Sequence, residues 1–234
     1  ASNNTGFGNE VFDDLTSGDS NTAVGSAALA KLTTAGENTA VGASALGANT
    51  SGAANTALGI NALFANTTAA NNTAVGRSSL EGNTTGTSNT AVGKDALQGN
   101  TTADNNTAVG YAALEANTTG TENTSVGADA MQTSVTGNYN VAVGGNALFA
   151  ANGADSNTGI GYNALAATTT GEFNTAVGSA ALATNTTADN NTAVGRNALL
   201  VNTTGHTNVA VGALALDANT TGNYNIALGV NALT

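Results

Sequence analysis

Large apolar side chains recur at two fixed places along this chain, and polar residues separate them in the same order each time. Each copy begins with Asn-Thr-Ala-Val-Gly or a close variant, and its Asn returns every 17 residues from Asn4 to Asn225 without insertion or deletion. Asn4 to Tyr224 therefore holds 13 full repeats, and residues 225–234 form a partial one. Fourteen copies in one register indicate a repeat architecture. We number the repeat positions 1 to 17 from this Asn.

The repeat favours a strand over a helix. Seventeen residues are too few for a helical hairpin repeat, which needs about 33, and position 2 is always β-branched. In Thr22-Ala23-Val24 the alternation of a strand predicts that Val24 points inward and Ala23 points outward. We expect an all-β fold, a parallel β-solenoid with 17 residues per coil and about 14 coils, in a single domain over residues 1–234.

Stacked coils place equivalent residues above one another, about 4.8 Å apart. Position 1 then becomes a ladder of side-chain amides, which stabilises stacked strands. Position 5 becomes a corner that needs the freedom of Gly, and positions 4 and 9 become two core columns. The ladder residues are Asn21, Asn38, Asn55, Asn72, Asn89 and Asn106. The corner residues are Gly25, Gly42, Gly59, Gly76, Gly93 and Gly110. The core residues are Val24, Leu29, Val41, Leu46, Val75 and Leu80.

Composition and charge narrow the functional classes. Fifteen acidic residues against four basic ones give a net charge of −11, which argues against a nucleic-acid partner. The absence of Cys excludes a disulfide framework, and His206, the single His, excludes a poly-His metal site. No apolar run reaches the roughly 18 residues of a transmembrane helix, so we expect no membrane insertion. No nucleophile and base recur together, and we expect neither an enzyme nor a cofactor.

A few acidic residues are candidates for binding a cation. Asp13, Asp14 and Asp19 crowd the first turns, where they could hold Ca²⁺ or form a solvated acidic end. Asp104 and Asp189 occupy equivalent positions and are each followed by Asn-Asn. They could also coordinate a cation, although the hydrogen bonding of a turn explains them equally well.

Two further surface patterns suggest ligands. Thr rows at positions 13 and 14, such as Thr67 and Thr68, suggest ice binding, but adjacent residues of a strand point to opposite faces, which argues against it. Aromatic residues at variable positions could line a sugar-binding or lateral-packing stripe, or lie scattered on the surface. These residues are Tyr111, Tyr139, Tyr162, Phe173 and Tyr224.

The motif Asn-Thr-Ala-Val-Gly-x-x-Ala-Leu, as in residues 21–29, resembles the head repeat of trimeric autotransporter adhesins, the YadA-like heads. It also resembles the NTAVG-rich repeats of bacterial and phage fibre proteins. The resemblance covers Asn4 to Leu233. It implies a left-handed β-roll, a surface or fibre role and often a homotrimer. The turn that contains Asn-Thr-Thr-Gly makes the coil longer than the YadA-type coil.

The two ends suggest how copies could join. Residues 225–234 supply positions 1 to 10 of a coil and residues 1–3 supply positions 15 to 17, so head-to-tail stacking would build a composite coil and a filament. The residues expected at this contact are Ala1, Ser2, Asn3, Phe7, Phe12, Asn225, Ile226, Leu228 and Leu233.

These observations together lead to one expected function and two alternatives. We expect a subunit of an extracellular fibre, secreted and freed of its signal peptide. Its expected partner is itself, as a homopolymer or homotrimer, with a cell-surface glycan or receptor as a further partner. The first alternative is the shaft or head of a phage tail fibre or trimeric adhesin that binds a host receptor. The second is an ice-binding solenoid.

Overall fold

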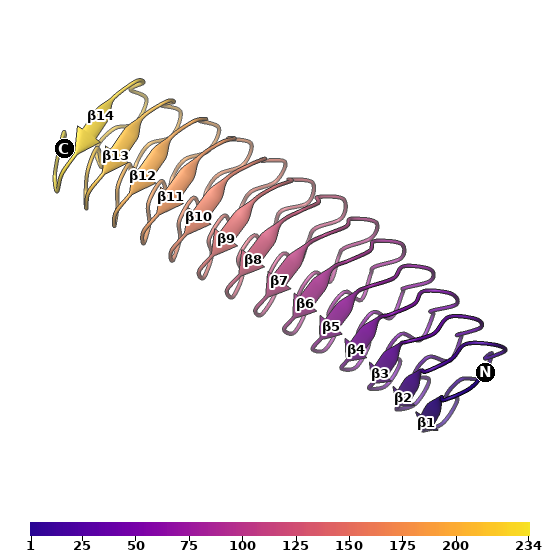
Figure 1. Cartoon of the computed structure of the whole chain (residues 1–234). Helices are drawn as coiled ribbons and strands as arrows, with labels where there is room; N and C mark the ends of the chain where they lie inside the picture. The colour runs from indigo at the N-terminus through magenta and orange to yellow at the C-terminus, as the bar shows by residue number, and fades with distance from the viewer. The chain divides into compact units, whose positions relative to one another are not determined.

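The computed structural model describes residues 1–234 as two compact units, Ala1–Thr119 and Gly120–Thr234. Each repeat contributes one three-residue strand, and the chain contains no helix (Figure 1). The first unit contains β1 (Thr5–Phe7), β2 (Thr22–Val24), β3 (Thr39–Val41), β4 (Thr56–Leu58), β5 (Thr73–Val75), β6 (Thr90–Val92) and β7 (Thr107–Val109). The second contains β8 (Thr124–Val126), β9 (Val141–Val143), β10 (Thr158–Ile160), β11 (Thr175–Val177), β12 (Thr192–Val194), β13 (Val209–Val211) and β14 (Ile226–Leu228).

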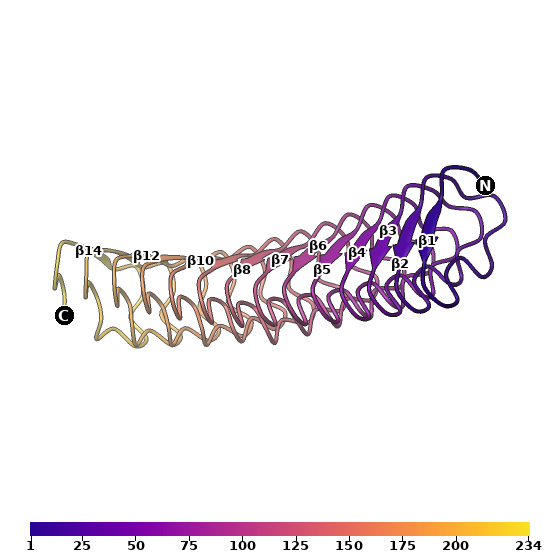
Figure 2. The same ribbon diagram turned by 90° about the horizontal axis from the view of Figure 1, so that it is seen from below.

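Within each unit the strands follow one another in sequence order and run parallel. Paired residues are one repeat apart, as in Thr22 with Thr39 in the first unit and Thr175 with Thr192 in the second. Figure 2 shows that the strands of each unit lie along one side of the coils, and turns form the rest of each coil. The predicted parallel β-solenoid with one coil per 17 residues is confirmed. Its left-handedness and the single domain remain predictions.

Consecutive reverse turns follow each strand. In the coil that begins at Asn38, the N–H groups at positions 8, 10 and 12 donate to carbonyls three residues earlier, at 3.3, 3.1 and 3.1 Å. Ser44 and Leu46 are the third residues of two of these turns, and their φ angles are 58° and 51°. A positive φ at this place is the feature of type II turns. The chain thus reverses over the eight residues from Gly42 to Asn49 and returns to the next coil.

Of the two predicted apolar core columns, the structure confirms the one at position 9 and corrects the one at position 4. Leu29, Leu46 and Leu80 are fully buried, as predicted for position 9. Position 4 is not a core position, because Ala23 is the fully buried residue of β2 and Val24 is only half-buried. The same correction applies to the other two predicted residues of that column, Val41 and Val75.

Space inside the coil explains why Ala rather than Val points inward. A Cβ atom added to Gly159, at position 3 of β10, would lie 3.3 Å from Cγ of Leu148. The Leu column therefore already fills the volume in front of position 3. Only a small side chain such as that of Ala fits there, because protein interiors are close-packed and an isopropyl group would overfill this narrow core.

The predicted corner glycines are confirmed. Gly25 has a φ of 134°, and a Cβ atom there would lie 2.5 Å from the carbonyl oxygen of Gly42 in the next coil. All six predicted glycines share this positive φ. Position 5 therefore requires Gly for its backbone conformation and, from Gly25 to Gly93, for the close approach of the next coil as well.

Candidate functional site

The predicted Asn ladder at position 1 exists in both units. Asn21, Asn38, Asn55, Asn72, Asn89 and Asn106 are all fully buried. Oδ1 of Asn21 accepts the backbone N–H of Asn38 at 3.0 Å and its side-chain Nδ2–H at 3.2 Å. Nδ2 of Asn38 also donates to the carbonyl of Gly52 at 2.9 Å, within its own repeat. Each Asn therefore joins two coils and closes one, which satisfies its buried polar atoms.

A second ladder lies at position 12, where the sequence suggested only turn chemistry. Asn83 is fully buried, and its Nδ2 donates to Oδ1 of Asn66 at 3.1 Å and to the carbonyl of Gly86 at 2.9 Å. The 17-residue recurrence of this Asn was visible in the sequence, but the Asn-Thr-Thr-Gly motif that contains it suggested a turn. This second ladder is interrupted at Ser134, Ala151 and Thr168.

Positions 2 and 4 of the strands form what we call the outer strand face of each unit. The pattern in most strands is a buried central residue between two partly exposed ones, as in β5 and β11. Position 4 is 39% exposed at Ile160 and 47% exposed at Leu58. Neither position is charged in any repeat. The outer strand face of each unit is therefore a regular array of Thr methyl and hydroxyl groups beside aliphatic side chains.

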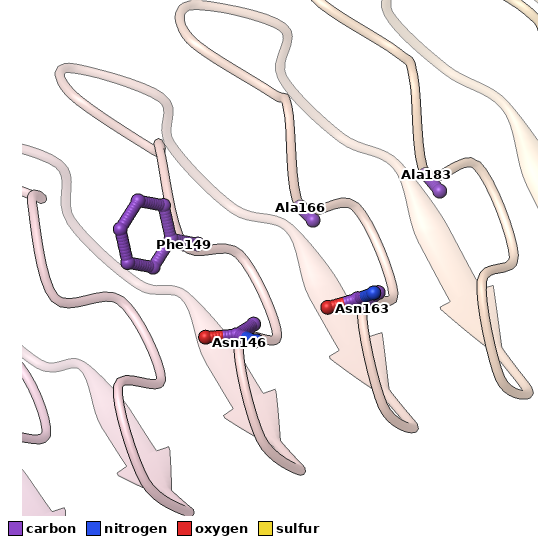
Figure 3. Close-up of a pocket in the computed structure, with 5 residues that line it drawn as sticks. All are labelled: Asn146, Phe149, Asn163, Ala166 and Ala183. Atoms are coloured by element: carbon purple, nitrogen blue, oxygen red, sulfur yellow. The ribbon is translucent and has the colours of Figure 1, made fainter.

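A shallow groove runs between positions 7 and 10 of the coils in the second unit, and we call it the Phe149 groove. Its volume is about 410 Å³ (Figure 3). The Phe149 ring bounds one end, and two Asn side chains from consecutive coils line one side. In the next two coils, the short side chains of Ala166 and Ala183 at position 10 leave the space open. The lining residues are Asn146, Phe149, Asn163, Ala166 and Ala183.

The first unit has a similar groove at the same repeat positions, with a volume of about 350 Å³ and Phe64 in its wall. Glu10, Asp13 and Lys31 line it, so its chemistry is charged. Later coils of that unit carry longer side chains at position 10. There Nε2 of Gln98 donates to Oε2 of Glu81 at 2.9 Å.

The candidate cation ligands do not gather into a site. Asp14 pairs with Nζ of Lys31 at 3.3 Å, and Asp19 accepts the backbone and hydroxyl hydrogens of Ser2. These hydrogen bonds from Ser2 lower the pKa of Asp19. Asp13 joins neither contact, and the chain contains no group of three His or acidic side chains placed to hold a metal ion. Of the two alternatives for Asp13, Asp14 and Asp19, these contacts support the acidic end rather than a Ca²⁺ site.

Asp104 and Asp189 hold backbone groups between coils. Asp104 accepts the N–H of Thr87 at 2.5 Å, and Asp189 accepts the N–H of Glu172 at 2.8 Å. Both acceptors serve position 16 of the preceding coil. Of the two readings left open by the sequence, the structure supports hydrogen bonding, although the acceptor bridges two coils rather than closing its own turn.

The aromatic residues do not form one stripe. His206 packs edge-on against Tyr224, with ring centroids 5.2 Å apart, beside a polar recess of about 260 Å³. In the first unit Nζ of Lys94 lies 5.2 Å from the centroid of the Tyr111 ring. A hydrogen bond to Asp95 raises the pKa of Lys94. Tyr139, Tyr162 and Phe173 are each more than half exposed.

The residues predicted to join copies lie mostly at the surface. Phe7, Ile226, Leu228 and Leu233 are among the most exposed large apolar side chains, and residues 1–3 are exposed. Phe12 and Asn225 are half-buried. Whether they contact another copy stays a prediction.

No family model and no curated protein matches this chain. The chain also has no helix of the length and apolar character that crossing a membrane requires.

Proposed function

We propose that this chain is a non-enzymatic structural protein, a subunit of an extracellular fibre or surface appendage. The observation that carries the proposal is the buried amide ladder at position 1, which runs from coil to coil in each unit, together with the interrupted ladder at position 12. Such ladders resist separation of coils, because breaking them leaves many buried polar groups without hydrogen-bond partners at once. An active site requires reactive groups that converge on one place, whereas these ladders repeat the same hydrogen bonds between successive coils.

The proposed assembly is head to tail. In both units the position 2 N–H donates to the position 1 carbonyl of the following coil, as in Thr22 to Asn38 and Val209 to Asn225, each at 2.8 Å. Ile226 occupies the same position in β14, so its N–H would donate in the same way to a copy stacked on this strand. A strand edge of this kind is a template for pairing with another chain.

Negative-stain electron microscopy of the purified chain tests this assembly. We expect filaments whose length grows with protein concentration. Ile226→Pro removes the donor and should abolish the filaments, whereas Ile226→Thr restores the commonest residue of position 2 and should keep them. Filaments that survive Ile226→Pro, or a chain that stays monomeric at high concentration, would contradict head-to-tail assembly. Short rods of three chains would instead favour the phage-fibre or trimeric-adhesin alternative.

Ice binding is a second candidate, and the outer strand face is the observation that favours it. The Thr rows that the sequence offered for ice binding were those at positions 13 and 14, and their adjacency argued against it. The regular uncharged rows are instead at positions 2 and 4, where Thr73 and Val75 of β5 point to the same side and repeat in β6. A repeating surface of methyl and hydroxyl groups suits the repeating water array of ice.

A thermal-hysteresis assay separates this candidate from the first. An ice-binding chain should shape ice crystals and depress the freezing point, and Thr73→Lys should weaken both effects by breaking the row. The absence of hysteresis at millimolar protein would remove ice binding and leave the fibre proposal unaffected.

A further inference from the structure

The Phe149 groove is open because two consecutive coils have a methyl side chain at position 10. Ala166 and Ala183 occupy the place where long side chains stand in four consecutive earlier coils. In the first unit those side chains bond to each other and to position 7, since Nδ2 of Asn61 donates to Oε1 of Glu81 at 3.2 Å. The groove is thus a local departure from a filled surface, made by the choice of one residue per coil.

Two amides line the groove at a fixed spacing. Asn146 and Asn163 occupy position 7 of consecutive coils, and the N–H of Asn163 donates to the carbonyl of Gly145 at 3.1 Å. Their φ angles of 54° and 56° are positive, a conformation that Asn tolerates well. Neither side-chain amide has a hydrogen-bond partner in the protein. Together they present two oxygen acceptors and two NH₂ donors to whatever lies between them.

An aromatic ring stands opposite to these polar groups. Phe149 is half-buried, and its carbonyl accepts the hydroxyl of Thr133 at 2.8 Å, which fixes the backbone beneath the ring. Tyr162 adjoins Asn163 in the chain, and its ring lies over Gly145, where a Cβ atom would be 3.5 Å from Cδ2. An apolar ring beside convergent amides is suited to a molecule with one CH-lined face and a rim of hydroxyl groups.

Charge decides between neutral and ionic ligands. None of the five lining residues is charged, although the chain as a whole carries −11. An anionic ligand would find no cation in this groove, and the net negative charge of the protein would repel it. A cationic ligand would find no carboxylate there. The groove of the first unit, with Glu10, Asp13 and Lys31, has the opposite character.

We propose that the Phe149 groove binds a neutral saccharide. The CH face of a sugar ring packs on Phe149, and its hydroxyl groups exchange hydrogen bonds with the amides of Asn146 and Asn163. The methyl groups of Ala166 and Ala183 form the floor. The volume of about 410 Å³ falls in the range of small-ligand sites. The site lies within Gly120–Thr234 and does not depend on fibre assembly.

Binding of the full-length chain to a printed array of neutral and anionic oligosaccharides tests the proposal. The strongest neutral binder is then titrated as free sugar and followed by saturation-transfer NMR. Ala166→Gln refills the groove with a residue that position 10 already carries at Gln98, so the fold should tolerate it. We expect this variant and Phe149→Ala each to weaken binding about tenfold or more. Ala30→Gln, the matched change in the first unit, should leave binding unchanged.

Three outcomes would overturn the proposal. The first is the absence of binding to any neutral saccharide at millimolar concentration. The second is selective binding of anionic sugars, and the third is binding that Ala166→Gln does not weaken. Electron microscopy of the same samples records filament assembly separately, so loss of saccharide binding in a chain that still forms filaments contradicts this site alone.

Discussion

At the scale of single residues, the coil depends on side chains held in the left-handed region of backbone space. Position 9 is the clearest case, because Leu46 and Leu80 have φ angles of 51° and 50°. A left-handed conformation costs a non-Gly residue about 1–2 kcal/mol. Burial of a Leu side chain stabilises by about 1.5–3 kcal/mol, so the core contact outweighs the strain. Propensity alone would have placed Gly or Asn at this position.

The interrupted ladder at position 12 leads to a prediction about one residue. Thr168 is fully buried and its Oγ1 has no hydrogen-bond partner. In Thr168→Asn, the new amide should donate to the carbonyl of Gly171 and accept from Nδ2 of Asn185. We expect stabilisation of about 1 kcal/mol and a rise in Tm of about 2–4 °C by calorimetry. Thr170→Asn, on the exposed neighbour two residues later, is the control and should leave Tm unchanged. A Tm of Thr168→Asn at or below the parent value would show that the ladder cannot be completed there.

At the scale of elements, each strand contributes one small inward residue, and the following turn contributes the large one. The repeat from Asn174 contains both kinds of apolar position in Leu182, which is fully buried, and Val177, which is half-buried. This arrangement makes the turns, rather than the strands, the main source of the apolar core.

A pair of truncations in that repeat measures the difference. Leu182→Ala should lower the free energy of unfolding by about 2–5 kcal/mol, because it removes buried methyl groups and leaves a cavity. Val177→Ala should cost about 1 kcal/mol or less, because its side chain already contacts water. Denaturant unfolding of both variants gives the two values. Equal losses would mean that position 4 belongs to the core after all.

The corner provides a second prediction at this scale, with its control one residue away. Gly144 has a φ of 129°, and a Cβ atom there would lie 2.7 Å from the carbonyl carbon of Gly161. Gly145 has no positive φ, and the atom nearest to a Cβ added there would be 3.5 Å away. Gly144→Ala should therefore destabilise by about 3 kcal/mol or more, and Gly145→Ala by at most about 0.5 kcal/mol. Thermal unfolding followed by circular dichroism tests both. Similar melting temperatures for the two variants would contradict the proposed role of the corner.

At the scale of the whole molecule, every coil within a unit meets its neighbours through the same strand pairing and the same position 1 amide ladder. The stability of such a protein is approximately a sum of repeat terms and nearest-neighbour interface terms. Length should therefore change in steps of one repeat, and fractions of a repeat should not be tolerated.

Two insertions in the second unit test this rule. Duplication of residues 174–190 adds one complete coil with its ladder contacts, and we expect Tm to stay the same or to rise. Insertion of one Ala between Thr192 and Ala193 turns the following side chains of β12 to the opposite face, so it should cost on the order of 3 kcal/mol. Differential scanning calorimetry compares the two proteins. Equal melting temperatures for the two insertions would mean that coil register is not the unit of stability.

Much of the fold could be predicted from the period alone. The 17-residue recurrence of Asn21 and Gly25 predicted the amide ladder and the corner. Stacking places identical residues above one another, so Asn amides can hydrogen-bond from coil to coil and Gly can allow a sharp bend in every coil. The Phe149 groove could not be predicted, because it depends on how Phe149 and two amides from different coils are oriented around a missing side chain. The ladder at position 12 lies between these cases, since its recurrence was visible and its burial was not.

The sequence by itself determined that the chain stacks in coils of 17 residues, and that Asn at position 1 and Gly at position 5 serve every coil. The period is a property of the sequence, so any fold with one repeat per coil places equivalent residues above one another. Only the tertiary structure decided which way each strand faces. Alternation allows either Ala23 or Val24 to point inward, and the choice depends on the volume left by the Leu column on the opposite side of the coil. That volume is set by turns in which Leu adopts a positive φ, a conformation that local sequence preference does not reveal.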